Sequence, residues 1–276
     1  MPSIPANAFH LVDAVGTHHG VAGETARIVS LVPSITELLF DLGLEGQIVG
    51  RTGFCIHPRD KVKRVPKVGG TKSIEAARVK RLTPTHLIVN IDENPRAAVE
   101  ELARFVPHVV VTHPRGPLDN LALYRLLGGI FEREAEAERL CHRFERSLTQ
   151  ATAAAAGWPR QSVLYLIWKA PWMTVSRDTY ISRMLAVVGW ETWEPKSEAR
   201  YPAIGLTPDL LQQVDLVLLS SEPYSFGPRH QAELLDALPL ASRTRVALID
   251  GSMTSWYGSR AIEGVEYLSR FRDRLG

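Results

Sequence analysis

The sequence of 276 residues has little cysteine, no long apolar run and almost no excess charge of either sign. Its two cysteines, Cys55 and Cys141, are too few for a disulfide framework or a thiolate metal cluster. Lysine and arginine exceed aspartate and glutamate by 32 − 30 = 2. Because these charges alternate along the chain without forming a basic block, nucleic acid is not expected as a partner. No run of about 20 apolar residues is present, so the sequence predicts no membrane-spanning helix.

The first 26 residues also lack the features of an export signal. They contain no lysine or arginine, and their one apolar stretch, Ala8 to Val15, is short and broken. The sequence as written therefore predicts a cytoplasmic protein, and a periplasmic one if a leader is missing from this chain. A monomer is expected in either compartment.

A long helical pattern, from Glu132 to Ala156, is the strongest feature that the sequence does have. Small or apolar residues recur at spacings of three and four, which predicts one buried stripe: Ala137, Leu140, Cys141, Phe144, Leu148, Ala151 and Ala155. Glutamates crowd the first turns, where the helix dipole favours negative charge, and Gly157 and Pro159 are stop signals. A helix of this span is roughly 37 Å long, enough to join two lobes. We therefore expect an N-terminal lobe at 1–131, a backbone helix at 132–156 and a C-terminal lobe at 157–276.

Apolar runs and helical patterns alternate on both sides of this helix. The predicted strands before it are Arg27–Leu31, Gln47–Val49, His86–Asn90 and Val109–Thr112, and those after it are Val163–Ile167, Leu216–Leu219 and Val246–Ile249. The predicted helices between them are Ile35–Phe40, Ser73–Arg81, Ala97–Phe105 and Ile181–Val188. Ser34, with Glu37 three residues later, predicts a capping box. The pattern indicates an α/β fold with two similar lobes, each with a mainly parallel sheet.

Several motifs occur in an order that resembles a known family. They are LVDAVG, RIVSLVPSITELLFDLGL, VGGTKSIE and NIDENP, followed by the long helix and the repeated lobe, from about Leu11 to Leu275. The chain is similar to the class III, or helical-backbone, metal-chelate receptors, which are the substrate-binding proteins of vitamin B12, haem and siderophore importers. GRTGFCIHP followed by VGGTK is most similar to the vitamin B12-binding-protein-like branch.

The resemblance implies a binding protein without enzymatic activity or an intrinsic cofactor. Its ligand would be a metal chelate carrying cobalt or iron, a corrinoid first and then haem or a siderophore. The ligand would lie in a cleft between the carboxyl ends of the two sheets, which is where open α/β sheets bind ligands. The protein would act with the permease of an ABC transporter, and one stiff helix would allow only a small hinge motion between the lobes.

Candidate ligand-binding residues follow strand ends in both lobes. The aromatic candidates are Phe54, Trp168, Trp172, Tyr201, Tyr224, Trp256 and Tyr257, and the polar ones are Ser34, Arg51, His57, Glu93 and Ser221. Aromatic faces match a flat macrocycle, although some of these rings are equally suited to the core. Arg51 and Lys169 are suited to carboxylates or phosphates on the ligand, or to solvent. His57 is the candidate axial ligand to cobalt or iron, and its alternative role is a loop hydrogen bond.

Two acidic residues are candidates for docking on a transporter. Exported members of the resembled family dock through one carboxylate on each lobe; Glu75 matches the first, whereas the second position falls near Thr207, with Asp209 the nearby acid. Two other functions stay open. A receptor for a bare transition metal needs three or four convergent ligands, with candidates among His57, Asp92, Glu93, His113, Glu222 and Asp250. A cytosolic chelatase-like enzyme on a related fold needs a general base beside a metal site.

Overall fold

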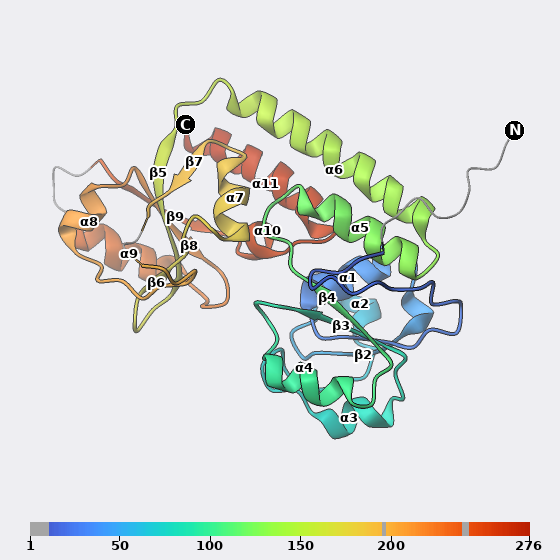
Figure 1. The fold of residues 1–276 in the computed structure, drawn as a ribbon. Helices are drawn as coiled ribbons and strands as arrows, with labels where there is room; N and C mark the ends of the chain where they lie inside the picture. The colour runs from blue at the N-terminus through green and yellow to red at the C-terminus, as the bar shows by residue number, and fades with distance from the viewer. Residues whose placement is uncertain (1–10, 195–196, 239–242) are drawn as a thin grey trace, which may run out of the picture. The chain divides into compact units, whose positions relative to one another are not determined.

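A computed structural model describes residues 11–194, 197–238 and 243–276, and the chain divides into two compact units (Figure 1). Unit 1 comprises the residues up to Pro114, together with Leu118–Arg143 and Tyr257–Arg260. Unit 2 comprises Arg115–Pro117, Phe144–Trp256 and Ala261–Gly276. The chain therefore passes from one unit to the other at several points, and the long helix is not their only covalent connection. The predicted boundaries at residues 131 and 156 stay a prediction.

The sheet of unit 1 has four parallel strands in the order β2-β1-β3-β4 (Figure 1). They are β1 (Ile28–Ser30), β2 (Ile48–Arg51), β3 (His86–Asn90) and β4 (His108–Thr112). Since all four strands run the same way, their carboxyl ends lie at one edge of the sheet, and the loops that follow them gather there.

Helices cover both faces of this sheet. The helices of unit 1 are α1 (Pro33–Asp41), α2 (Arg59–Val62), α3 (Ala76–Arg81), α4 (Arg96–Ala103) and α5 (Asp119–Ile130), with a short 3₁₀ helix, η1 (Glu45–Gln47). Val29 and Val89 point to the face covered by Val79 of α3 and Leu102 of α4, where they form a buried cluster. Figure 1 shows α3 and α4 together on that side and α1 on the other. The alternation of side chains along each strand supplies both faces with apolar residues.

The capping box predicted at Ser34 is wrong. Helix α1 begins at Pro33, Val32 is its N-cap, and no side chain caps it. Proline at the first helical position needs no N–H partner and has its φ preset for the helix, so the start shifts one residue ahead of Ser34. Glu37 instead pairs with Arg260, whose Nε lies 2.7 Å from Glu37 Oε2.

The sheet of unit 2 has five strands. They are β5 (Gln161–Trp168), β6 (Met173–Thr174), β7 (Trp190–Thr192), β8 (Leu216–Ser220) and β9 (Arg245–Ile249). β5, β8 and β9 run parallel in that order; β7 pairs parallel with the first half of β5, and β6 pairs antiparallel with its end. The predicted α/β fold with mainly parallel sheets is confirmed, with one antiparallel strand in unit 2.

One face of this sheet is closed by α8 (Pro208–Gln212) and α9 (Pro228–Ala237), whose leucines share an apolar cluster with β5 and β8. The remaining helices of unit 2 are α7 (Tyr180–Ala186), α10 (Ser252–Ser255) and α11, which runs from Arg260 to Leu275. Opposite side chains of the same strands, such as Tyr165 and Leu218, are also buried, so the sheet is covered on both faces.

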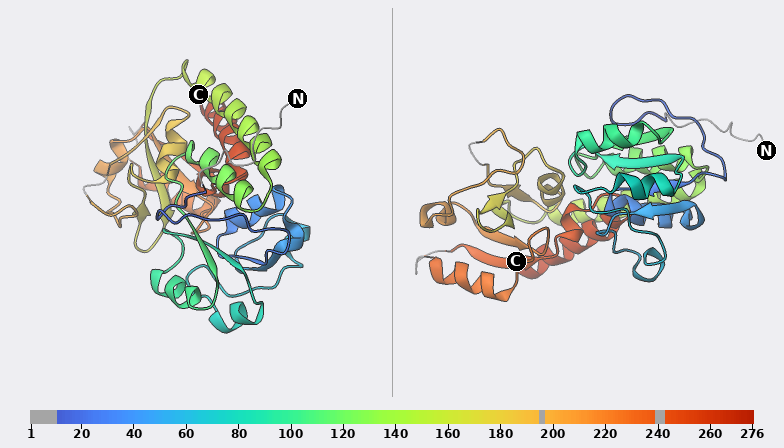
Figure 2. Two further views of the ribbon diagram at one scale, coloured as in Figure 1. Left: turned by 45° about the vertical axis from the view of Figure 1, so that its right-hand side comes forward. Right: turned by 90° about the horizontal axis from the view of Figure 1, so that it is seen from below.

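The predicted long helix is confirmed as α6, which spans Glu134–Ala155. On its predicted stripe, Ala137, Cys141, Phe144 and Ala151 are buried. In unit 2 the second half of α6 lies alongside α11 (Figure 2), and Ser147 donates a hydrogen bond of 2.8 Å to Glu266. Among the helices of the described ranges, none combines the length and the apolar character needed to cross a membrane.

Candidate functional site

Three apolar side chains of unit 1 stand in solvent at the carboxyl edge of its sheet. Phe54 and Ile56, in the loop after β2, are 63% and 52% exposed, and Ile91, directly after β3, is 47% exposed. Exposed apolar side chains at the carboxyl edge, where open α/β sheets bind ligands, make this edge a candidate binding surface. We call these residues, with the β3 loop described next, the strand-end surface of unit 1.

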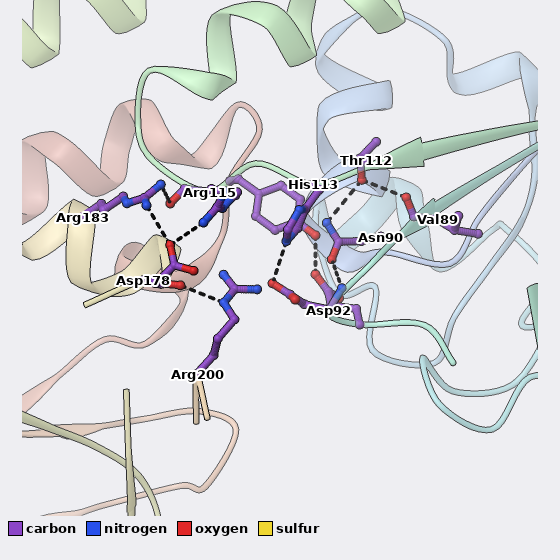
Figure 3. A network of polar contacts seen from close by, with 11 residues as sticks. Val89, Asn90, Asp92, Thr112, His113, Arg115, Asp178, Arg183 and Arg200 are labelled. Carbon is purple, nitrogen blue, oxygen red and sulfur yellow. Dashed lines mark hydrogen bonds and ion pairs between the residues drawn. The ribbon is translucent and has the colours of Figure 1, made fainter. Parts of the chain in front are cut away.

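The loop after β3 is held by side-chain amides. Asn94 Oδ1 accepts from the Asn90 N–H at 2.9 Å, and Asn94 Nδ2 donates to the Leu31 carbonyl at 3.3 Å. Asn90 Oδ1 accepts from the Asp92 N–H at 2.8 Å. The Asp92 carboxylate lies 3.5 Å from His113 Nε2, at the end of β4 (Figure 3). These bonds fix the course of the loop that carries the predicted ligand residue Glu93.

The sequence predicted that Tyr257 presents its ring for stacking on the ligand. The structure shows that it does not. Its ring is only 6% exposed, and its hydroxyl donates to Glu93 Oε1 at 2.5 Å. Burial, followed by the negative charge of Glu93, raises the pKa of Tyr257 well above its usual value, so the phenol keeps its proton. Tyr257 is therefore bonded to the strand-end surface through Glu93. Ser34 is buried as well, in the first turn of α1.

Arg51 is buried under the loop that carries Phe54. Its guanidinium donates to the carbonyls of Val65, Thr52 and Cys55 at 3.0 to 3.2 Å. Since these bonds join two loop segments from inside, we assign Arg51 to holding Phe54 in place and leave it out of the proposed ligand contacts. Burial raises the pKa of the Cys55 thiol, which keeps this neighbouring group neutral.

Within the part of the chain that the structure describes, no three histidine, cysteine or acidic side chains come together as a metal site. Asp92 and His113 meet, but the other candidates do not join them in a ligand set. A receptor for a bare transition metal therefore lacks its ligands among these residues. An axial ligand to a chelate needs only one imidazole, and His57, half-buried in the loop after β2, stays a prediction for that role.

Aromatic rings pack on one another at the carboxyl ends of the strands in unit 2. Trp168, at the end of β5 and 40% exposed, meets Tyr224 edge-on with centroids 5.6 Å apart. Tyr224 lies 4.6 Å from Phe226, and Trp172 stacks parallel to Phe226 at 5.9 Å. Lys169 Nζ lies 5.3 Å from the Trp172 ring centroid and pairs with Glu233.

This aromatic cluster, formed by Trp168, Trp172, Tyr224 and Phe226, brings three of the predicted ligand residues together. Phe226 was missed because it lies six residues beyond the end of β8, outside the strand-end positions that the sequence singled out. The predicted Tyr201 is not one of these four rings; it is 37% exposed, and the Arg200 guanidinium lies 5.8 Å from its ring.

Trp256 is buried too, at 9% exposure, and so does not offer the stacking face that was predicted. Its indole Nε1 donates to Glu222 Oε1 at 2.6 Å, and the Ser255 hydroxyl donates to the same oxygen at 3.0 Å. Ser221 Oγ accepts from the Gly251 N–H at 2.9 Å. The loops after β8 and β9 are thus joined, and Glu222 is held by donors from the end of α10.

An arginine cluster that the sequence did not reveal holds residues 115–117 to unit 2. Arg115 and Arg183 donate to Asp178 Oδ1 at 2.6 and 2.8 Å, and Arg200 Nε donates to the Asp178 carbonyl at 2.7 Å (Figure 3). The bond from Arg115, ahead of the other arginine charges, lowers the pKa of Asp178. A Cβ at Gly116 would lie 3.1 Å from Arg183 Cδ, so glycine permits this close approach.

The two candidate docking carboxylates are exposed on their own units. Glu75 precedes α3, and its carboxylate lies 2.8 Å from Arg78 Nε. Asp209 lies in the first turn of α8. Both are accessible in these places, and their docking role stays a prediction.

Residues 28–234 match the model of a family described as periplasmic binding protein. A vitamin B12-binding protein of Pectobacterium carotovorum is 23% identical over 199 residues, which cover 71% of this chain and 72% of that protein. YvrC of Bacillus subtilis, an uncharacterized ABC transporter substrate-binding lipoprotein, is 23% identical over 275 residues. The match covers 93% of this chain and 83% of YvrC. The apo structure of the periplasmic heme-binding protein RhuT from Roseiflexus sp. RS-1 has a TM-score of 0.77 at 22% identity, covering 91% of this chain and 100% of that one. This similarity confirms the fold.

Proposed function

The chain belongs to the periplasmic binding protein family, and from this premise we propose that it is the substrate-binding component of an ABC importer. Its proposed ligand is a metal chelate with a flat macrocycle, a corrinoid first and haem second. Members of this family bind a substrate without transforming it, so the protein is not an enzyme, and the chelatase-like alternative falls away.

The observation that supports this ligand class is the apolar character of the strand-end surface of unit 1 and of the aromatic cluster of unit 2, which we call the strand-end surface of that unit. Unit 1 exposes Phe54, Ile56 and Ile91, and unit 2 exposes Trp168 on its aromatic cluster. A macrocycle has two broad apolar faces, and each ring stacked on it contributes about 1 kcal/mol beyond its burial. That the two surfaces contact one ligand together stays a prediction.

We propose a corrinoid ahead of haem as the ligand because of the chemical groups at the edge of each macrocycle. A corrinoid carries amide side chains that donate hydrogen bonds, whereas haem carries carboxylates. The strand-end loops carry Asp92 and Glu93 in unit 1 and Glu222 in unit 2, and these carboxylates accept from amides and repel other carboxylates. The vitamin B12-binding relative supports the same order.

A titration of the protein with cyanocobalamin, dicyanocobinamide and haemin, followed by absorption and calorimetry, tests the proposal. We expect saturable binding of a corrinoid, with haemin weaker. Phe54→Ala and Trp168→Ala should each weaken binding by roughly tenfold, equivalent to about 1.4 kcal/mol. Leu235→Ala is the matched control, since Leu235 is also exposed but lies near the end of α9, away from the strand ends. The proposal fails if none of the three probes binds, or if the control weakens binding as much as the other two variants.

A further inference from the structure

Two consecutive residues reach the strand-end carboxylates of different units. Trp256 is the last residue of its segment of unit 2, and Tyr257 is the first of the segment Tyr257–Arg260 of unit 1. The Trp256 indole donates to Glu222, within unit 2, and the Tyr257 hydroxyl donates to Glu93, within unit 1. Each bond thus ends on a carboxylate that the proposed function places near the ligand.

The two carboxylates hold equivalent places in the two sheets. Glu93 follows β3, which lies between β1 and β4, and Glu222 follows β8, which lies between β5 and β9. Both strands are therefore interior strands with parallel neighbours on each side, and the loops after them leave from the middle of the carboxyl edge. Ligands of open α/β sheets contact this part of the edge.

We propose that Trp256 and Tyr257 are positioning residues: they hold Glu222 and Glu93 in the orientations that meet the ligand, without touching it themselves. This inference rests on the proposed function. It replaces the stacking role that the sequence predicted for the two rings with a role in fixing hydrogen-bond acceptors.

Burial makes both side chains suitable for this role. The two rings are 9% and 6% exposed, so the packed interior fixes their donors in place. The phenol keeps its proton, because its pKa is raised by burial and by Glu93, and an indole N–H is always a donor. A ligand then meets carboxylates whose side-chain freedom is already lost, and the ordering penalty on binding is smaller.

The backbone that follows Tyr257 is held as firmly. The Gly258 N–H donates to Asn120 Oδ1 at 2.7 Å, and the Tyr124 hydroxyl donates to the Gly258 carbonyl at 2.8 Å. Gly258 has a φ of +79°, and a Cβ there would lie 3.2 Å from the Ser34 carbonyl oxygen, so the segment fits closely against α1 only with glycine at this position. The donor of Tyr257 therefore starts from a fixed main chain.

Double-mutant cycles on cyanocobalamin binding test the inference. Tyr257→Phe keeps the ring and removes the donor, and Glu93→Ala removes the acceptor; Trp256→Phe with Glu222→Ala forms the second cycle. We expect Tyr257→Phe to weaken binding by about tenfold in the wild-type background and by less than about twofold in the Glu93→Ala background. The second cycle should show the same coupling, because the indole acts through Glu222.

A matched control separates positioning from stability. Trp190→Phe removes another buried donor, whose indole N–H donates to Gln161 Oε1 at 3.1 Å, at the start of β5, and not to a carboxylate. It should lower the melting temperature and leave the dissociation constant for cyanocobalamin unchanged. If Tyr257→Phe behaves in the same way, or if the losses in either cycle simply add, the inference is overturned while the proposed function stands. If wild-type protein binds none of cyanocobalamin, dicyanocobinamide and haemin, the proposed function fails, and the inference fails with it.

Discussion

The strand-end surfaces of the two units share a topology and differ in how they are built. In unit 1, polar side chains such as Asn90, Asn94 and Arg51 hold the loops from inside, and single apolar residues project from them. In unit 2, aromatic rings form the surface and support one another. Parallel strands thus determine where the loops gather, and local chemistry determines what each surface offers a ligand.

The interiors of the units differ in a similar way. Unit 1 contains the ion pair of Arg260 with Glu37, whose side chains are 8% and 14% exposed. In unit 2 the buried guanidinium of Arg272 lies 5.8 Å from the rings of both Trp158 and Trp190 and donates to the Pro159 carbonyl. We therefore expect unit 1 to be sensitive to the loss of charges and unit 2 to the loss of rings.

Loss of the buried cation should have the largest effect. Arg260→Met leaves the Glu37 carboxylate without its buried cation and should lower the free energy of unfolding by roughly 3–5 kcal/mol. Arg96→Met is the control, because the Arg96 side chain is 92% exposed and its solvent-screened pair with Glu100 contributes little to stability. Urea denaturation measures both. Equal, small losses would contradict the dependence of unit 1 on this pair.

Two tryptophans of unit 2 should separate stability from binding. Trp190→Ala removes a fully buried ring and should lower the free energy of unfolding by roughly 3–5 kcal/mol. Trp168→Ala should leave thermal unfolding nearly unchanged and weaken corrinoid binding by roughly tenfold. Calorimetric melting and ligand titration of both variants check this contrast, and a large fall in melting temperature for Trp168→Ala would place that ring in the core.

Acid should destabilise unit 1 through His86. Burial, followed by the charges of His108 and His19, lowers the pKa of His86 to about 4 from its usual 6.5. Between these values the unfolded chain binds a proton that the folded unit does not, so stability falls as the pH drops from 6.5 towards 4, by at most roughly 3 kcal/mol. Above pH 6.5 the protonation of His86 no longer changes the stability of the folded unit. Urea denaturation at several pH values should show a flatter profile for His86→Phe, and an unchanged slope would contradict the assignment.

The smallest effect concerns helix starts. Helix α7 has Thr179 as its N-cap, whose hydroxyl accepts from the Ser182 N–H, whereas α1 begins without a side-chain cap. Thr179→Ala should lower the free energy of unfolding by about 1 kcal/mol. Thr207→Ala, at the equivalent position of α8, should lower the free energy of unfolding by about the same amount. Thermal melts of both variants measure this effect. The capping role is refuted if neither variant lowers the melting temperature.

Regular elements were predictable because their signals are local. The strand His86–Asn90 was predicted with the bounds that the structure has, and the long helix differs by two residues at its start and one at its end. The strands β6 and β7 were missed, since runs of two or three residues carry no periodicity. Helices α5, α9 and α11 were also left out of the prediction.

The candidate site was predictable only in part. Strand ends identified Phe54, Trp168 and Tyr224 as residues at the carboxyl edges. The sequence does not show, however, that Tyr257 bonds to Glu93 across 164 positions, or Trp256 to Glu222 across 34. Whether an aromatic ring faces solvent or packs against a carboxylate depends on packing between distant segments, which no local pattern encodes.

The ¹⁵N-indole spectrum of the protein, recorded without and with diamagnetic cyanocobalamin, tests the central claim most directly. Each tryptophan contributes one N–H resonance, so the strand-end surface of unit 2 and its interior are observed in the same experiment. The account predicts that binding shifts the resonances of Trp168 and Trp172 and leaves those of Trp158 and Trp190 in place. Shifts at Trp158 and Trp190 with Trp168 and Trp172 unchanged would contradict it, because the ligand would then bind away from the strand ends.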